Sequence, residues 1–180
     1  MHKSIAIITG ASTGIGRSLA IKLSGQYLVY LISRNKENLN KTKKLINAQN
    51  NECKIIVSDI SKTKSIDDIY SQIENKEKIE LLINNAGIGL FKSISDTTIE
   101  DWDNTINTNL RGSFLMTKMI IDNLKSKQNG KIVFISSVAG LQPYKNSTAY
   151  VASKFAMRGF AASLREELRE FNIKVITVFP

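Results

Sequence analysis

The sequence is poor in three features on which whole classes of protein depend: cysteine, histidine and long apolar runs. It contains one cysteine, Cys53, so a disulfide framework is excluded and a cytoplasmic location is expected. No stretch reaches the roughly 18 consecutive apolar residues of a transmembrane helix, and the apolar run near the N-terminus is too short for a signal peptide. The sequence therefore predicts no membrane span.

Positive charge exceeds negative charge, and the formal net charge is +9. Such an excess raises the question of a nucleic-acid or membrane-surface partner. The lysines are scattered through amphipathic stretches, however, and no compact basic run is interleaved with aromatic residues. We therefore expect a solvated, lysine-rich surface that suits an anionic cofactor or substrate, with neither nucleic acid nor membrane as a partner.

The 180 residues, of which 42% are hydrophobic, are enough for one domain with its own core. Apolar, β-branched runs alternate with stretches whose apolar residues have helical spacing. Strands are expected at residues 4–9, 27–33, 53–57, 81–84, 131–136 and 173–179, helices at 14–24, 36–48, 61–73 and 149–170, and one long or two broken helices within 98–125. This alternation predicts a doubly wound parallel α/β sheet in a single domain, residues 1–180.

Ser61 is the expected N-cap of its helix, and Leu39, Leu45 and Ile46 are expected to face the core.

A glycine-rich turn with Gly10, Gly14 and Gly16 separates the first strand from the first helix. These glycines permit a tight turn and close backbone approach, and the helix N-terminus offers free N–H groups to a pyrophosphate. The pattern Gly-x-Ser-x-Gly around Ser12 also fits the nucleophile elbow of a hydrolase, but the only histidine, His2, precedes the serine and leaves the triad without a base. No Gly-Lys-Ser/Thr closes the turn, as it would in a kinase or GTPase loop. The turn therefore predicts a phosphate-binding site.

Tyr150 and Lys154 lie four residues apart in the helix expected at 149–170. Residues at this spacing lie one above the other on a helix face. An ammonium near a phenol favours the phenolate, which makes the phenol usable as a proton donor and acceptor near neutral pH. The same spacing also occurs by chance on exposed helices, so the pair gains its meaning from its surroundings.

Four further segments follow one another at the ends of expected elements. They are Asp59-Ile60, Asn84-Asn85-Ala86-Gly87, Asn107-Thr-Asn109-Leu-Arg-Gly112 and Ile135-Ser-Ser137-Val-Ala-Gly140. Together with the glycine turn and the Tyr150–Lys154 pair, this series resembles the short-chain dehydrogenase/reductase family over residues 4–180. The resemblance implies a Rossmann fold with strand order 3-2-1-4-5-6 and a nicotinamide cofactor. It also implies hydride transfer between a small-molecule carbonyl and the corresponding alcohol.

The resemblance further implies roles for individual residues. Tyr150 would exchange a proton with the substrate oxygen, and Ser137 would hydrogen-bond the same oxygen. Lys154 would assist Tyr150 and hold the nicotinamide ribose, while Asn109 would open its helix locally and hold a water of the proton relay. No metal is expected. The cofactor-binding set would be Gly10, Ser12, Thr13, Gly14, Ile15, Gly16, Ser33, Arg34, Asp59, Ile60, Asn85, Ala86, Gly87, Tyr150, Lys154 and Pro180.

The end of the second expected strand favours NADP over NAD. NAD-preferring sites usually place an acid there to bind the ribose 2′-hydroxyl, whereas this chain has Ser33 followed by Arg34. A guanidinium suits a 2′-phosphate because it forms paired hydrogen bonds. Another common mark of NADP-dependent family members is a basic residue just before the second turn glycine. This mark is absent, because Thr13 occupies that position.

Members of the family normally continue beyond the position of Pro180 with a substrate lid and a further strand. We therefore expect the sequence to be a fragment of a longer enzyme. The alternative is a truncated, catalytically disabled protein that binds nucleotides or partners on the same fold. Residues 102–125 and 149–170 match the helices that family dimers pack together, which predicts a homodimer or homotetramer.

Overall fold

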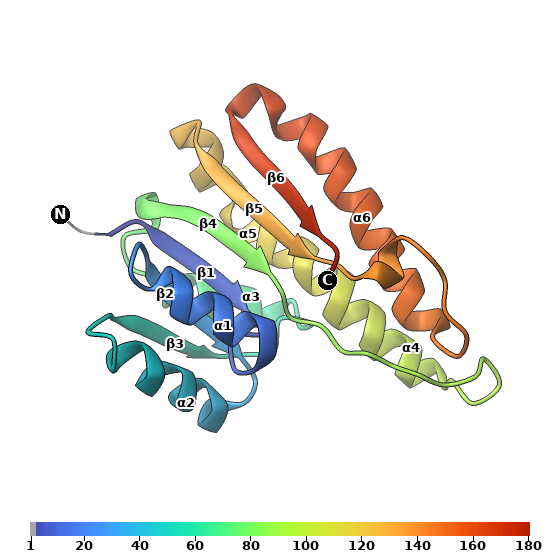
Figure 1. Ribbon diagram of the computed structural model, residues 1–180. Helices are drawn as coiled ribbons and strands as arrows, with labels where there is room; N and C mark the ends of the chain where they lie inside the picture. Colours follow the sequence, from blue (N-terminus) through green and yellow to red (C-terminus); the bar gives the residue numbers. More distant parts are fainter. Residues whose placement is uncertain (1–2) are drawn as a thin grey trace.

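The computed structural model describes residues 3–180, so His2 lies outside it. Within this range, six strands and six α-helices alternate along the chain (Figure 1). The strands are β1 (Ile5–Thr9), β2 (Leu28–Ser33), β3 (Cys53–Val57), β4 (Ile79–Asn84), β5 (Gly130–Ile135) and β6 (Ile173–Val178). The helices are α1 (Gly14–Leu23), α2 (Lys36–Asn47), α3 (Lys64–Ser71), α4 (Ile99–Ile106), α5 (Gly112–Lys127) and α6 (Thr148–Leu168). A π turn at Asn107–Arg111 and short 3₁₀ turns at Lys76–Lys78, Val138–Gly140 and Arg169–Phe171 complete the regular structure.

The strands form one parallel sheet in the order β3-β2-β1-β4-β5-β6. β1 pairs with β2 on one side and with β4 on the other, so the direction of winding reverses between β1 and β4. Ligands of doubly wound folds bind at the carboxyl ends of the strands at this switch point. The predicted sheet and its strand order are confirmed, and they position the glycine turn after β1 beside the segment after β4.

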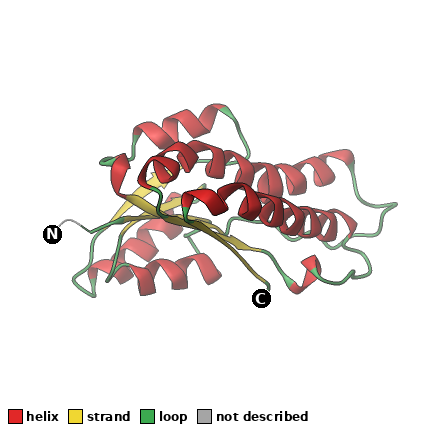
Figure 2. Ribbon diagram, turned by 90° about the horizontal axis from the view of Figure 1, so that it is seen from above, coloured by secondary structure: helices red, strands yellow, loops and turns green. Residues whose placement is uncertain are grey.

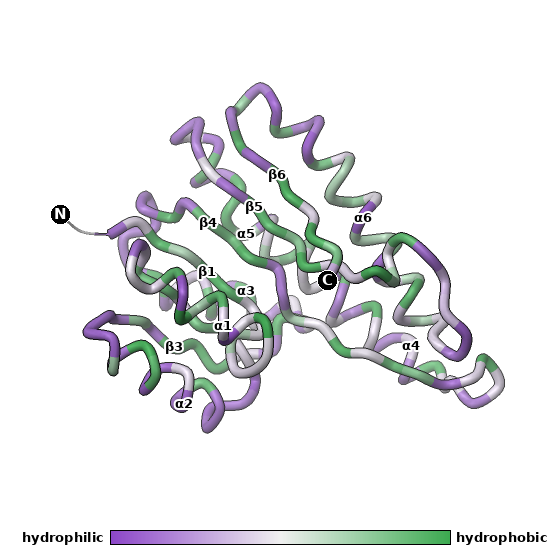
Figure 3. The backbone as a smooth tube through the Cα atoms, viewed as in Figure 1, coloured by the Kyte–Doolittle hydropathy of each residue, from purple (hydrophilic) through white to green (hydrophobic). Residues whose placement is uncertain are grey.

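Helices cover both faces of the sheet, as Figure 2 shows from its edge. α1 and α2 bury side chains such as Leu39 and Ile46 on one face, while α3, α5 and α6 bury a larger apolar set on the other. β1 is buried along its whole length, and the hydropathy colouring of Figure 3 shows the apolar character of the central strands. None of the helices within residues 3–180 combines the length and apolar character that a bilayer span requires. The prediction that Leu45 faces the core is wrong, since it is 47% exposed and lies beside the buried stripe of α2.

The helix expected at 61–73 is shorter, because α3 begins at Lys64 with Thr63 as its N-cap. Ser61, the predicted N-cap, binds Asp59 instead. Its backbone N–H and its hydroxyl donate to the same carboxylate oxygen at 3.1 and 2.8 Å. Such a local turn competes with helix formation and holds Ser61 ahead of α3. The predicted cap is therefore wrong, and the interaction fixes the carboxylate of Asp59.

The region expected to hold one long or two broken helices contains α4 and α5, which a π turn joins without a loop. Thr98 begins α4 with a reciprocal capping box to Asp101. The π turn at Asn107–Arg111 widens the helix locally, a feature often found at functional sites. Asn109 is buried at the centre of this turn, so the helix opens where the resemblance locates an active-site asparagine.

Candidate active site

The turn after β1 has the geometry of a phosphate cradle. Gly10 and Gly14 adopt left-handed backbone conformations, with φ values of 66° and 52°, which glycine adopts without strain. Thr13 precedes α1 in an extended conformation, and its side chain caps no N–H group of the first turn. The first N–H groups of α1 therefore stay free at the positive end of the helix dipole, as a bound pyrophosphate requires.

Two residues at the switch point tie the turn to the end of β4. The amide nitrogen of the Asn85 side chain donates to the carbonyls of Thr9 and Gly10, at 2.9 and 3.2 Å. The hydroxyl of Thr9 in turn accepts the backbone N–H groups of Asn85 and Ala86, at 3.0 Å each. A Cβ on Gly16 would overlap the Gly10 carbonyl and the Asn85 amide. The glycine at this position thus allows α1 to pack directly on the turn.

A cavity of about 520 Å³ opens along this edge of the sheet. Its volume lies within the usual range of ligand sites. Twelve residues of the predicted cofactor set line it: Gly10, Ser12, Thr13, Gly14, Ile15, Ser33, Arg34, Asp59, Ile60, Asn85, Ala86 and Gly87. The lining also contains residues that the sequence did not indicate: Ile32, Ser58, Ile88 and Thr108. The free helix terminus and the size of the cavity fit a dinucleotide.

Four residues of the predicted cofactor set do not line this cavity: Gly16, Tyr150, Lys154 and Pro180. Gly16 is buried beneath the turn, where it contributes to packing. Pro180 lies at a separate apolar hollow beside α1, and its carbonyl accepts the N–H of Val138 at 3.0 Å.

Hydroxyl and guanidinium groups gather at the end of β2. The hydroxyl of Ser33 donates to that of Ser12 at 3.0 Å, and Arg34 follows with an exposed side chain. Arg17, on the first turn of α1, donates to the Ser12 carbonyl and, at 3.1 Å, to the hydroxyl of Thr42. The sequence alone did not indicate that Arg17 holds this turn in place. Its only signal was a position directly after Gly16.

Tyr150 and Lys154 both project from the N-terminal half of α6. The Lys154 ammonium lies 5.7 Å from the centroid of the Tyr150 ring and donates to the Ile135 carbonyl at 2.9 Å. Lys154 is only 4% exposed, and burial lowers its pKa from 10.5 to about 8. The expected helical stacking of phenol and amine is therefore present, and the end of β5 anchors the amine.

The two serines after β5 have different environments. The hydroxyl of Ser136 is buried and donates to the Lys154 carbonyl at 3.3 Å. Ser137 is half-buried, and its hydroxyl oxygen accepts the N–H of Ala139 at 3.2 Å. Because that contact uses an acceptor site, the hydroxyl hydrogen of Ser137 remains free for a substrate oxygen. Of the two hydroxyls, that of Ser137, the residue implied by the resemblance, is thus the one whose hydrogen is available to a substrate oxygen.

Asn109 links three segments through its side-chain amide. The amide oxygen accepts the N–H of Ile88 at 2.8 Å, and the amide nitrogen donates to the Ile88 carbonyl and to the Ser153 hydroxyl, at 3.0 Å each. The Ser153 hydroxyl itself donates to the Tyr150 carbonyl at 2.7 Å. The amide therefore fixes the π turn, the segment after β4 and α6 relative to one another. Ser153 was not predicted, and its place beside Lys154 was the only sequence signal.

Gly87 is the point at which the cavity meets these side chains. A Cβ placed on it would stand 3.3 Å from the Asn109 amide oxygen and 3.6 Å from the Lys154 amine. Gly87 also lines the cavity. The cavity and the Lys154 amine thus share one border, so a cofactor bound in the cavity would lie beside the phenol–amine pair.

Comparisons with known proteins agree with this arrangement. The sequence model of the family described as short chain dehydrogenase matches residues 4–180. A sepiapterin reductase from Chlorobaculum tepidum is 34% identical over 99% of this chain and 77% of its own length. The crystal structure of a metagenomic short-chain oxidoreductase in complex with NADP is 31% identical, with a TM-score of 0.94 over 100% of this chain and 83% of that one. NAD⁺-bound xylitol dehydrogenase is 27% identical, with a TM-score of 0.92 over 99% and 70% of the two chains. The chain belongs to the short-chain dehydrogenase family.

Proposed function

We propose that this chain is an NADP-dependent oxidoreductase that interconverts a carbonyl and an alcohol, with Tyr150 as the proton donor and acceptor. The observation that carries the proposal is the position of Lys154. Its buried amine lies beside the Tyr150 ring and borders Gly87, which lines the cavity. Membership of a dehydrogenase family, with a relative named as a reductase, supports the same class of reaction.

The site residues divide the chemistry among them. A nicotinamide cofactor held along the cavity would supply the hydride for the carbonyl carbon, or would accept one from the alcohol. As negative charge grows on the carbonyl oxygen, the Tyr150 hydroxyl gives that oxygen its proton. Ser137 donates its free hydrogen to the same oxygen and so holds the carbonyl in place. Lys154 carries positive charge beside the phenol and stabilises the phenolate that remains.

Asn109 has a positioning role in this scheme. Its amide groups are taken up by Ile88 and Ser153, so the side chain holds the two walls of the site together. The π turn at Asn107–Arg111 interrupts the regular α-helix here, and the Ser113 hydroxyl donates to the Asn109 backbone carbonyl at 2.8 Å. A carbonyl oxygen has a second lone pair, which suits a water that returns protons to Tyr150.

The preference for NADP rests on the groups at the end of β2. Arg34 borders the cavity with an exposed guanidinium, and the neighbouring hydroxyls belong to Ser12 and Ser33. β2 ends in Ser33, and Arg34 follows it directly; neither residue is a carboxylate, which would repel a 2′-phosphate. The relative solved with NADP is consistent with this choice, and the xylitol dehydrogenase solved with NAD⁺ shows that related folds accept either cofactor.

Calorimetric titration of NADPH and NADH tests this preference. Wild-type protein is expected to bind NADPH at least about tenfold more tightly, because hydrogen bonds to a charged group contribute about 1.5–3 kcal/mol. Replacement of Arg34 by alanine should weaken NADPH binding by about tenfold or more and leave NADH binding unchanged. Equal affinity of the wild type for both cofactors would contradict the assignment of NADP.

Replacement of Tyr150 by phenylalanine tests the reaction itself. Loss of the proton donor should lower kcat by about 10²–10⁴-fold on any carbonyl substrate found in a screen. Thermal stability should remain close to that of the wild type, because the ring and its contacts are kept. Turnover that survives this substitution would sink the proposed mechanism. NADPH binding without turnover by the wild type on any carbonyl would support the alternative, a nucleotide-binding protein without catalysis.

A further inference from the structure

One segment connects the cavity to the face of the reactive tyrosine. We call residues 88–98, between β4 and α4, the strap. It begins at the cavity, where the Asn109 amide holds both backbone groups of Ile88. Figure 1 shows the strap running from the end of β4 towards the start of α4 alongside the N-terminal half of α6. Its middle meets the residue before α6, because Lys92 forms a parallel bridge with Ser147.

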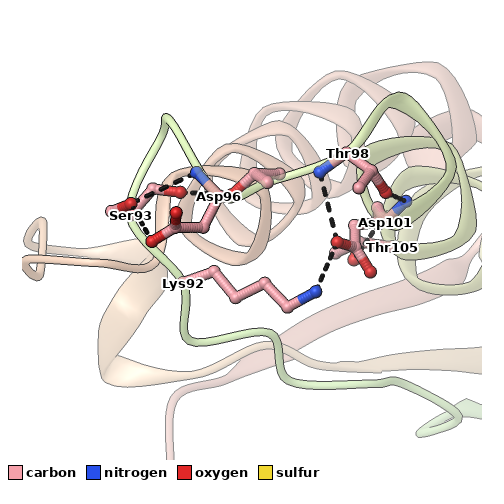
Figure 4. A network of polar contacts seen from close by, with 7 residues as sticks. Lys92, Ser93, Asp96, Thr98, Asp101 and Thr105 are labelled. Atoms are coloured by element: carbon pink, nitrogen blue, oxygen red, sulfur yellow. Dashed lines mark hydrogen bonds and ion pairs between the residues drawn. The ribbon is translucent and has the colours of Figure 1, made fainter.

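Polar contacts fasten the far half of the strap (Figure 4). The Lys92 ammonium lies 2.6 Å from an oxygen of Asp101, which also accepts the N–H of Thr98 at 3.2 Å. The Asp101 N–H is in turn bound to the Thr98 hydroxyl at 3.0 Å. Ser93 and Asp96 close a tight turn between these anchors, with side-chain contacts at 2.5 and 3.2 Å. The strap is thus a braced loop, although its surface is exposed.

Phe91 lies within the short span between the anchored residues Ile88 and Lys92. Its ring centroid is 5.9 Å from that of Tyr150, with the two planes at 49°. Gly89 leaves room for this ring, because a Cβ there would stand 3.1 Å from the Phe91 ring. The ring is nevertheless 72% exposed. Phe91 is thus a large apolar side chain beside the reactive phenol, and most of its surface is exposed. It can therefore contact a molecule that binds at that phenol.

The segment on the other side of the site is also apolar. Val138, Leu141 and Tyr144 follow Ser137 and are all exposed. The Tyr144 hydroxyl accepts a hydrogen bond from the Gln142 side chain at 2.8 Å. Apolar side chains therefore adjoin both groups that would bind the substrate oxygen: Phe91 lies against Tyr150, and Val138 directly follows Ser137. This composition suits an apolar substituent on the carbonyl carbon.

We propose that Phe91 determines substrate specificity by packing against an aromatic group attached to the reacting carbonyl, and that the Lys92–Asp101 ion pair holds Phe91 in position. The inference rests on the proposed function, since it assigns the substrate class of that same site. Aromatic pairs gain energy beyond the burial of their area when the rings tilt or stack with an offset. A substrate ring covers the exposed face of Phe91 while its carbonyl reaches Tyr150 and Ser137. A small aliphatic ketone covers little of that face.

Two methyl ketones with the same reacting group test the inference: 2-acetylnaphthalene and 2-butanone. Replacement of Phe91 by alanine should lower kcat/KM for the naphthyl ketone about tenfold and leave that for 2-butanone within about twofold. Replacement of Ile94 by alanine is the matched control, because Ile94 lies on the same strap with a similar exposure of 71%. This control should change neither value.

Replacement of Lys92 by methionine tests the role of the ion pair. It should lower kcat/KM for the naphthyl ketone, as the Phe91 variant does, and should leave the unfolding temperature unchanged.

A binding measurement separates this inference from the proposed reaction. Saturation-transfer NMR would record 2-acetylnaphthalene bound to the protein with NADPH, for the wild type and for Phe91→Ala. Binding that depends on Phe91 without any turnover would support the inference and contradict the proposed function. Three results would each overturn the inference. The first is equal binding of the naphthyl ketone by wild type and Phe91→Ala, and the second is an equal loss of kcat/KM for both ketones in Phe91→Ala. The third is a naphthyl ketone that is neither bound nor turned over. A loss in Ile94→Ala as large as that in Phe91→Ala would overturn it as well.

Discussion

At the scale of single residues, Lys154 is the clearest case of a group whose surroundings disfavour its charged form. It is almost fully buried in α6, and its one side-chain hydrogen bond recorded within residues 3–180 goes to the Ile135 carbonyl. A carbonyl stabilises an ammonium less than an ion pair or bulk water does, so desolvation dominates. The burial of this ammonium therefore lowers the stability of the fold, and such a cost is expected where a charge acts on a reacting group.

The pKa of Lys154 leads to a prediction about stability at alkaline pH. Burial lowers the folded-state pKa to about 8, against 10.5 when the side chain is solvated. Between these values the unfolded chain binds more protons than the folded one, so the contribution of Lys154 to stability should rise with pH by about 3 kcal/mol in total. Denaturant unfolding of wild type and Lys154→Met from pH 7 to 10.5 measures this difference. A difference that stays constant across the window would show that the amine is not desolvated.

The sequence predicted the four catalytic candidates but not the residues that hold them. Tyr150 and Lys154 have a helical spacing that is visible along the chain, whereas Asn109 and Ser137 follow from the resemblance to the family. The contacts made by Arg17 and Ser153 join residues 25 and 44 positions apart. Such contacts depend on how the elements pack, and a single sequence carries no signal for that packing.

At the scale of elements, α1 shows how closely a helix must approach the sheet edge to form the site. Gly16 is a helical residue whose missing side chain admits the Gly10 carbonyl and the Asn85 amide. Expected helix boundaries were least accurate at α3, because the Asp59 carboxylate draws Ser61 into a turn. The π turn could likewise be expected only from the resemblance, since the apolar pattern of 98–125 continues through it.

Replacement of Gly16 by alanine should separate α1 from the turn after β1. The gain in helix propensity is about 1 kcal/mol, but the new methyl group meets a backbone carbonyl, and overpacking of this kind typically destabilises by about 1–3 kcal/mol. We expect a lower unfolding temperature and weaker NADPH binding, measured by circular dichroism and calorimetry. Gly25→Ala, just beyond the other end of α1, is the control, because a Cβ there meets nothing within 4 Å. Gly25→Ala should be neutral or slightly stabilising. An equal response of both variants would contradict the packing argument.

At the scale of the whole molecule, the fold was the most predictable feature. Apolar strands that alternate with amphipathic helices admit few arrangements other than a doubly wound sheet, because crossovers between parallel strands are right-handed and both faces need cover. The order of the strands followed from the resemblance. The strap could not be foreseen in the same way, since its shape depends on the Lys92–Asp101 ion pair and on a bridge to Ser147.

The helices on one face of the sheet lead to a prediction about assembly, which we propose to be at least dimeric. Trp102, Phe114 and Phe155 are exposed on α4, α5 and α6, and large exposed apolar side chains often mark protein interfaces. Light scattering after size exclusion should give the wild type at least twice the mass of one chain. Phe155→Glu should give a single-chain mass, because a carboxylate buried in an apolar interface remains unpaired. Leu45→Glu is the matched control on α2, where a similarly exposed apolar residue lies on the opposite face of the sheet. The Leu45→Glu control should leave the mass unchanged. The assignment of this face as the interface would be refuted if the wild type had the mass of one chain. It would also be refuted if Phe155→Glu kept the larger mass.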